Sequence, residues 1–260
     1  MEKNSAYAIK LTNVCKNFGG LQAVKNVNMA VKKGERKLLI GTNGAGKTTL
    51  FNMIAGDFPV SSGEIEVFGQ NVNKLSMVQR TRLGLKRTYQ TSSLFNELTV
   101  RQNLYLAVLG EKPVRQQMSL FKLWKSNKAD QERIEKAAKE IGFDDRLDTL
   151  VESLSHGERR QLELGLALIC NPKILLLDEP AAGLSADERK TLVKLIQALP
   201  ADMTVVMVEH DFALALSVAD SITVMFDGEI VAEGDPDSIK NNETVRSIYL
   251  GGVLNDDASP

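Results

Sequence analysis

The sequence predicts an α/β fold with a core around a buried parallel sheet, a small antiparallel β-lobe and a helical subdomain. Three observations support this fold class. Near the N-terminus, apolar residues alternate in short runs, which is typical of half-buried antiparallel strands. The centre of the chain carries apolar residues at helical spacing. After Pro172, continuous apolar runs return with helical segments between them, as expected for a buried parallel sheet.

The antiparallel β-lobe is predicted from two stretches of the chain. Between residues 9 and 31, apolar residues alternate with polar ones in patches, and residues 63–69 contribute Ile65 and Val67. We expect strands before and after the segment that separates these stretches.

That intervening segment contains a phosphate-binding motif. Residues 41–48 read Gly-Thr-Asn-Gly-Ala-Gly-Lys-Thr and fit the pattern G-x-x-x-x-G-K-[ST]. An apolar run ends at Ile40, and residues 47–55 show helical spacing before Gly56, the predicted helix stop. Strand, loop and helix follow in the required order, which disfavours a glycine-rich surface turn. The chain is therefore predicted to be a nucleoside triphosphatase built on a P-loop NTPase core.

The chemistry of phosphate binding explains the residue types in this loop. Glycines let backbone N–H groups turn toward phosphate oxygens, and the helix that follows adds its positive dipole. Lys47 is expected to reach the outer phosphates, while the Thr48 hydroxyl is a candidate magnesium ligand. The predicted nucleotide-binding residues of the loop are Asn43, Gly44, Ala45, Gly46, Lys47, Thr48 and Thr49.

Beyond the β-lobe, two stretches with helical spacing predict the helical subdomain. They contain Val100, Leu104 and Val108, and then Ile134 and Ile141. Residues 110–130, which include a proline, are predicted to be an irregular link between them.

The parallel sheet is predicted from residues 174–177, 204–208 and 222–225, and Asp227-Gly228 is a predicted hairpin turn. The first of these strands ends in Asp178-Glu179. In open α/β folds ligands bind at the carboxyl ends of strands. Asp178 is the expected indirect holder of magnesium, and Glu179 the candidate for orienting and deprotonating the attacking water. The alternative is that both carboxylates only cap the following segment.

Composition excludes several classes of function. The formal net charge of −1 and pI near 6.2 argue against broad adhesion to nucleic acid. Cys15 and Cys170 lie far apart in the sequence, so neither a disulfide framework nor a zinc site is indicated. No signal peptide and no apolar run of membrane-spanning length is found, so we expect a cytoplasmic protein.

Residues 154–158 read Leu-Ser-His-Gly-Glu and open another predicted helix. Here the chain resembles the ATP-binding cassette (ABC) family, whose signature at this place is Leu-Ser-Gly-Gly-Gln. The resemblance covers nearly the whole chain, because further family elements follow in order: an aromatic residue before the phosphate loop, a glutamine after a strand, the Asp-Glu pair and a late histidine. These elements are Phe18, Gln90, Asp178-Glu179 and His210.

The resemblance implies a mechanism in which two such domains sandwich two ATP molecules. Each ATP is then held by the phosphate loop of one subunit and the signature helix of the other. It implies that Ser155, Gly157 and Glu158 belong to the ATP-binding residues, and the start of a helix is a plausible anion site. Ser155 and Glu158 also satisfy a capping box, which is a purely local alternative.

The resemblance also implies roles for three isolated residues. Gln90 would sense magnesium and the attacking water, His210 would contact the γ-phosphate, and Phe18 would stack on adenine. Glu179, His210 and Gln90 are thus the expected catalytic residues, and Thr48, Gln90 and Asp178 the expected metal site. The structural alternatives are a solvated strand end for Gln90, a turn residue for His210 and a core position for Phe18.

The sequence departs from the family pattern at four positions. Thr42 replaces the usual proline of the phosphate loop, His156 replaces the first signature glycine, and Glu158 replaces glutamine. Ser185 stands where an aspartate is common, which puts the usual cross-subunit contact near the base in doubt. A non-glycine at position 156 indicates that this backbone position does not need positive φ.

The family resemblance divides the chain into two domains. We expect residues 1–90 and 166–260 to form a RecA-like nucleotide-binding core with the antiparallel β-lobe. Residues 91–165 are expected to form the helical subdomain that carries the signature motif.

Several runs are similar to the ATPase subunits of branched-chain amino acid importers and their amide or urea relatives. The ATPase subunit of the lipopolysaccharide exporter is the alternative, because its size and C-terminal ending are similar. Soluble non-transport ABC ATPases are an alternative of another class, and the single phosphate loop argues against paired-domain types among them. The runs in question are residues 87–90, 94–100, 179–184 and 249–252.

The resemblance also implies partners. We expect a second ATPase subunit, identical or mixed, and a separate membrane permease, which would hold the chain peripherally on the inner face of the cell membrane. The permease groove would lie beside Leu94, Phe95 and Leu98. These residues could equally anchor the helical subdomain to the sheet.

Overall fold

The computed structural model describes residues 5–88, 94–112, 127–210 and 212–248. The chain divides into two compact units, which are described separately below. The first unit comprises residues 1–87, 173–180 and 199–260, and the second comprises residues 88–172 and 181–198.

This division differs from the predicted domain boundaries at residues 88–90 and at two longer segments, residues 166–172 and 181–198. Residues 166–168 complete helix α6 (His156–Leu168), so a boundary at position 165 cuts through a continuous helix. Residues 181–198 contain helix α7 (Ala186–Gln197), which is hydrogen-bonded to the start of α6. Both segments therefore belong to the unit that contains the signature residues.

The first unit contains a four-stranded antiparallel sheet in the order β2-β1-β4-β5. In the pairing register, Leu11 of β1 faces Met29 of β2 on one side and Ile65 of β4 on the other. All three side chains are buried, so the alternation seen in the sequence marks the inner face of the predicted β-lobe. The strands are β1 (Tyr7–Phe18), β2 (Leu21–Lys32), β4 (Ser62–Val67) and β5 (Gln70–Asn71).

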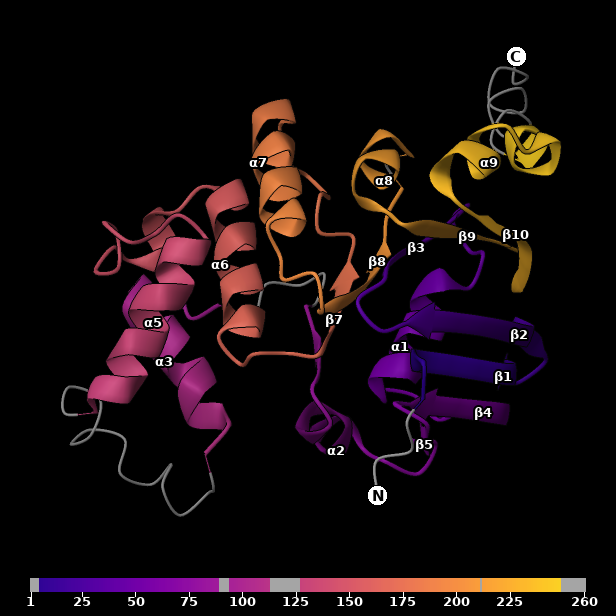
Figure 1. The fold of residues 1–260 in the computed structure, drawn as a ribbon, viewed down its shortest axis with the longest axis horizontal. Coiled ribbons are helices and arrows are strands. Elements are labelled where there is room, and N and C mark those ends of the chain that lie inside the picture. The colour runs from indigo at the N-terminus through magenta and orange to yellow at the C-terminus, as the bar shows by residue number, and fades with distance from the viewer. Residues whose placement is uncertain (1–4, 89–93, 113–126, 211, 249–260) are drawn as a thin grey trace. The chain divides into compact units, whose positions relative to one another are not determined.

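The second sheet of this unit has the order β10-β9-β3-β8-β7-β6 and is parallel except for the β9–β10 hairpin (Figure 1). Val208 pairs with both Leu39 and Asp178, so β3, β8 and β7 end at the same edge. The segments that follow these three strands therefore meet there. The strands are β3 (Arg36–Gly41), β6 (Leu85–Arg87), β7 (Ile174–Asp178), β8 (Thr204–Val208), β9 (Ser221–Phe226) and β10 (Glu229–Gly234).

Helix α1 (Lys47–Ala55) packs against strands of both sheets. Its Leu50, Phe51 and Ile54 are fully buried in one cluster with residues such as Val27 of β2 and Val206 of β8. Each such side chain contributes about 1.5–3 kcal/mol through burial, which fixes α1 at the edge where β3 ends. The remaining helices of this unit are α2 (Met77–Arg82), α8 (Phe212–Val218) and α9 (Pro236–Lys240).

The second unit is helical. Ile134 of α5 and Leu162 of α6 are fully buried, and α3, α5 and α6 pack on one another (Figure 1). Capping boxes begin α3, α6 and α7, and the box at the start of α6, Ser155 with Glu158, is the one predicted from the sequence. Its elements are α3 (Val100–Gly110), α5 (Lys128–Glu140), η1 (Val151–Ser153), α6 and α7.

Local predictions of turns and stops are confirmed. Helix α1 ends at Gly56, which has φ of 94° as a C-terminal cap requires. Asp227 and Gly228 both have positive φ in the β9–β10 turn, the geometry favoured for tight hairpins. Much of the predicted link at 110–130 lies outside the described residues. Within the described part of the chain, no helix has the length and apolar character needed to cross a membrane.

Candidate nucleotide-binding site

The phosphate-binding loop joins the end of β3 to the start of α1. Gly46 is the N-cap of α1 with φ of 94°, and a Cβ there would collide with the Ala23 carbonyl oxygen. Of the α-helices whose N-caps the structure describes, α1 alone begins without a side-chain cap, and its first turn has no acidic residue. Its first N–H groups are thus left for an external anion.

The Lys47 side chain folds back over this loop. Its Nζ donates to the backbone carbonyls of Gly41 at 2.8 Å and Thr42 at 2.9 Å. Burial lowers the pKa of Lys47, while the nearby charges of Glu179 and Asp178 act in the opposite direction. A buried ammonium held by two carbonyls at the mouth of the loop is suited to exchange these acceptors for phosphate oxygens.

The other predicted loop residues differ in exposure. Asn43, Gly44 and Thr48 are exposed, whereas Ala45 is buried and accepts a hydrogen bond from the Gly228 N–H at 3.1 Å. Thr49 and Gly46 are half-buried. The exposed residues lie together around the uncapped start of α1, and Ala45 anchors the loop to the β9–β10 turn.

Asp178 ends β7 and is almost completely buried, with 2% of the residue exposed. Its Oδ2 accepts a hydrogen bond from Arg87 Nη2 at 2.6 Å, and its Oδ1 has no partner among the described residues. Burial raises the pKa of Asp178 above its usual value, and Arg87 opposes this shift through its hydrogen bond and charge.

Glu179 and His210 lie next to one another where β7 and β8 end. His210 Nε2 lies 2.5 Å from Glu179 Oε1, although 31 positions separate the two residues. Glu179 has φ of 47°, a left-handed conformation that is costly for glutamate and is held by a hydrogen bond from its N–H to the Val208 carbonyl. Such strain is concentrated at functional sites. The pair is a contact that the sequence could not supply.

Phe18 is at the end of β1 and is 44% exposed, so it is not a core residue of the β-lobe. Its ring packs edge-to-face against Phe58 with 5.8 Å between centroids, and Lys16 Nζ lies 5.0 Å from its centroid. An exposed aromatic face with a fixed orientation is able to stack on a base.

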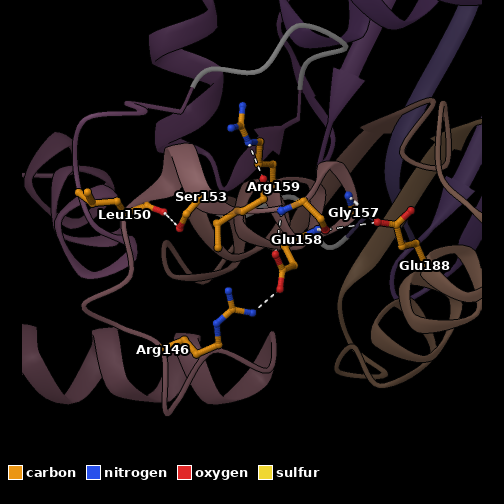
Figure 2. Close-up of polar contacts among 9 residues, drawn as sticks. Arg146, Leu150, Ser153, Gly157, Glu158, Arg159 and Glu188 are labelled. Carbon is orange, nitrogen blue, oxygen red and sulfur yellow. Dashed lines mark hydrogen bonds and ion pairs between the residues drawn. The ribbon is translucent and has the colours of Figure 1, made fainter.

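In the second unit, Ser155 is the N-cap of α6. Its Oγ accepts from the Glu158 N–H at 3.2 Å and Glu158 Oε2 accepts from the Ser155 N–H at 2.8 Å, so the local capping box is present. Arg146 forms an ion pair with the other oxygen of Glu158 (Figure 2). Burial alone would raise the pKa of Glu158, but the Arg146 and Ser155 hydrogen bonds outweigh it and lower the pKa.

A second carboxylate reaches the start of α6 from α7. Glu188 Oε1 accepts from the Gly157 N–H at 3.0 Å (Figure 2). It also accepts from Ser155 Oγ at 3.3 Å. This contact is not among the predictions made from the sequence. A signal existed, because residues 185–188 read Ser-Ala-Asp-Glu, the same S-x-x-E pattern as at the start of α6, and Ser185 is the N-cap of α7.

The structure places the remaining candidates as follows. Gln90 lies outside the described residues. Phe95 is 57% exposed, whereas Leu94 and Leu98 are half-buried. His156 begins α6 and does not have positive φ, as expected from its replacing a glycine.

The site also fits magnesium, which the predicted chemistry requires. Asp178 Oδ1 is a buried carboxylate oxygen without a described partner, and Thr48 is exposed beside the uncapped helix start. No cluster of three or more His, Cys, Asp or Glu that could hold a metal occurs among the described residues. Magnesium is usually held by one or two carboxylates together with substrate phosphates. The Asp178 carboxylate and the Thr48 hydroxyl fit this type of coordination.

Three features meet at one edge of the sheet. They are the phosphate loop after β3, which leads into the uncapped start of α1, the Asp178-Glu179 pair at the end of β7, and His210 after β8. Together they define a P-loop nucleoside triphosphatase. The sequence profile of the ABC transporter family matches residues 24–182, and the chain belongs to this family as an ATPase. A second profile, described as branched-chain amino acid ATP-binding cassette transporter, matches residues 229–254.

Known proteins of this family match the chain over nearly its full length. The high-affinity branched-chain amino acid transport ATP-binding protein LivG of Escherichia coli (strain K12) is 36% identical over 248 residues, 94% of this chain and 97% of LivG. A crystal structure of the ADP conformation of an ATP-binding cassette of an ABC transporter is 28% identical with a TM-score of 0.84, covering 95% of this chain and all of that one.

A third comparison concerns a dimer. The dimeric structure of a post-hydrolysis state of an ATP-binding cassette bound to ADP and Pi is 26% identical, with a TM-score of 0.74. The match covers 88% of this chain and 98% of that chain.

Proposed function

We propose that the chain hydrolyses ATP with magnesium at the edge where β3, β7 and β8 end, and that two copies or related subunits close around two ATP molecules to drive a separate permease. The observation that carries the chemistry is the 2.5 Å approach of His210 to Glu179 beside the phosphate loop. The predicted residue roles and the predicted division into a nucleotide-binding core and a signature-carrying subdomain belong to this proposal.

Residues of the phosphate loop bind the triphosphate. The free N–H groups at the start of α1 and the Lys47 ammonium bind phosphate oxygens, and Phe18 stacks on the adenine. Thr48 and Asp178 hold magnesium together with the phosphates, and Gln90 completes this set. When bound, magnesium neutralises charge that develops on the transferred phosphoryl group.

Glu179 orients the attacking water and accepts its proton. His210 fixes the Glu179 carboxylate through Nε2, and its exposed ring can turn to the γ-phosphate. Because a carboxylate only accepts hydrogen bonds, Nε2 carries the proton of this pair while Glu179 is ionised. Glu179 is therefore held ready with one oxygen engaged and the other available to water.

The signature segment supplies the second half of a composite site. Ser155, Gly157 and Glu158 begin α6, and a helix start that faces a γ-phosphate binds it through N–H groups and the helix dipole. The dimeric relative bound to ADP and Pi supports this assembly. The capping box uses the Glu158 N–H and not that of Gly157. The Gly157 N–H is bound by Glu188 Oε1, so an incoming γ-phosphate has to displace the Glu188 carboxylate from the helix start.

The transported solute is proposed from the relatives. LivG and the profile at residues 229–254 support import of branched-chain amino acids, and amides or urea are the nearest alternatives. Neither finding favours a lipopolysaccharide exporter or a soluble non-transport ATPase. A permease partner places the chain in the cytoplasm, peripherally on the inner face of the membrane. Exposed Phe95, beside Leu94 and Leu98, is the proposed contact with that partner.

The chemical step is tested with Glu179→Gln. This variant should still bind ATP and accumulate as a dimer, while steady-state turnover falls by orders of magnitude, because an amide cannot take the proton of water. Glu64→Gln, an exposed change on β4, is the matched control and should hydrolyse ATP normally. Unaltered turnover in Glu179→Gln would remove Glu179 from the role of base.

The coupling is tested by isolating the chain with its native permease and reconstituting the complex in vesicles. We expect ATP-dependent uptake of a branched-chain amino acid, and hydrolysis by the isolated chain that rises with its own concentration. Uptake of urea or an amide alone would reassign the solute. Hydrolysis independent of both protein concentration and permease would refute the coupling.

A further inference from the structure

Arg87, the last residue of β6, connects three elements of the first unit. Its Nη2 donates to Asp178 Oδ2 at 2.6 Å, and its Nη1 lies 2.5 Å from both Asp57 Oδ2 and Asn52 Oδ1. Asn52 lies in α1 and Asp57 follows that helix. Arg87 therefore joins the helix after the phosphate loop to the strand that carries Asp178.

The Arg87 side chain is rigidly held. It is 7% exposed, and its guanidinium lies 5.4 Å from the centroid of the Phe51 ring of α1. A guanidinium that is buried, stacked and bonded on both sides has one available orientation. The orientation of the Asp178 carboxylate is consequently set by Arg87.

The way Arg87 divides its donors determines what Asp178 can still bind. Arginine frequently takes both oxygens of one carboxylate with two parallel hydrogen bonds. Here Nη1 is engaged by Asp57 and Asn52, so only Nη2 reaches Asp178. Asp178 Oδ1 is left buried and without a partner among the described residues.

We propose that Arg87 is a positioning residue for the metal site: it fixes Oδ2 of Asp178 so that Oδ1 stays available to magnesium, and Asp57 and Asn52 keep Arg87 from taking both oxygens. The assignment rests on the proposed role of Asp178. It gives a function to an arginine that is not among the predicted nucleotide-binding or metal-binding residues.

Two simpler explanations make different predictions. If Arg87 acted only as a nearby positive charge, its removal would tighten the binding of a cation, because like charges repel. If it were only a structural ion pair, its removal would lower stability and leave the metal affinity of the folded protein unchanged. The positioning role alone predicts weaker metal binding by a folded protein.

The test measures Mn²⁺ binding by electron paramagnetic resonance, with ADP present, for the full-length chain. Arg87→Met should weaken Mn²⁺ binding by about tenfold or more, the usual effect of removing a residue that orients a metal ligand. ADP affinity without metal should remain as in the parent protein. Lys10→Met, an exposed change on β1, is the control and should bind Mn²⁺ normally.

Two further variants separate the possible outcomes. Arg87→Lys keeps the charge but cannot bind Asp178 together with Asp57 and Asn52, so it should also weaken Mn²⁺ binding. If Arg87→Met does not unfold cooperatively, the Mn²⁺ affinity of Arg87→Lys tests the proposal in its place. Unchanged or tighter Mn²⁺ binding in the folded variant overturns the proposal. Asp178→Asn is the reference: normal Mn²⁺ binding there would instead overturn the proposed metal role of Asp178.

Discussion

Glu188 Oε1 accepts a hydrogen bond from the Gly157 N–H at 3.0 Å, so a carboxylate of α7 occupies the start of α6. Hydrogen bonds from Ser185, and further ones from Gly157 and Ser155, lower the pKa of Glu188, which is therefore ionised at neutral pH. A Cβ on Gly157 would collide with this carboxylate. The signature segment thus carries its own anion where the proposed function places a phosphate.

Replacing Glu188 by Gln should strengthen the ATP-dependent association of two subunits. The amide can still accept the Ser185 N–H and complete the capping box of α7, but it no longer places a negative charge at the start of α6. From the usual effect of a charge at a helix terminus, we expect half-maximal dimerisation at an ATP concentration that is lower by roughly two- to fivefold. Analytical ultracentrifugation measures the fraction of dimer as a function of ATP concentration, in the Glu179→Gln background, in which ATP is bound but not turned over.

Asp187→Asn is the matched control for that experiment. Asp187 precedes Glu188 on α7, its side chain is 92% exposed, and it pairs with Lys190 rather than with α6. Its removal changes the net charge by the same amount. Equal shifts in both variants would show that overall charge, and not the carboxylate at the start of α6, controls association.

Lys47→Ala should weaken the binding of ATP itself. A charge-assisted hydrogen bond of the kind proposed for its Nζ is worth about 1.5–3 kcal/mol, which corresponds to a loss of roughly tenfold or more in affinity. Calorimetric titration with ATP measures this, with Lys10→Ala as an exposed control. Normal ATP affinity in Lys47→Ala would contradict the proposed phosphate site.

Arg80→Met should destabilise the first unit without touching the site. Arg80 is buried, and its Nη1 donates to the carbonyls of Met53 at 2.6 Å and Ile54 at 2.8 Å, at the end of α1. Methionine leaves these carbonyls without a donor, at a cost of roughly 3 kcal/mol. Urea unfolding measures the loss. Arg82→Met, an exposed change on the same helix, should unfold like the parent, and an equally stable Arg80→Met would refute the capping role.

Glu158→Gln should change how stability depends on pH. The pKa of Glu158 is below its ordinary value of 4.5, so the ionised form stabilises the fold above that pH, and the contribution is lost as pH falls through the folded-state pKa. The variant should therefore be less stable by about 0.2–1 kcal/mol at neutral pH, with the difference vanishing in acid. Urea midpoints at several pH values check this against exposed Glu135→Gln. A difference that stays constant with pH would contradict the Arg146 pairing.

The phosphate loop shows which features can be predicted from local sequence. Its pattern, the apolar run before it and the stop at Gly56 predicted the strand, the loop and the helix that the structure contains. These features depend on neighbouring residues and on backbone freedom at glycine. The capping box of Ser155 and Glu158 was predictable for the same reason, because its partners are three residues apart.

Contacts between distant segments could not be predicted in this way. Arg87 meets Asp178 across 91 positions, and Gly157 meets Glu188 across 31. In the sequence, Arg87 is only part of a run typical of a subfamily, and nothing in that run indicates which oxygen of Asp178 it binds. The predicted boundary at 165 depends on such contacts too, because α6 continues to Leu168 and its Gly157 is hydrogen-bonded to Glu188 of α7.

The sequence by itself determined the class of chemistry, because phosphate binding requires a short run of residues at fixed spacing, which can be recognised in the sequence. Tertiary structure alone decided how the charges of that chemistry are distributed: one oxygen of Asp178 engaged and one open, Glu179 held by His210, and Glu188 placed on α6. The physical reason is that hydrogen-bond partners are chosen by distance and angle after the strands and helices have packed.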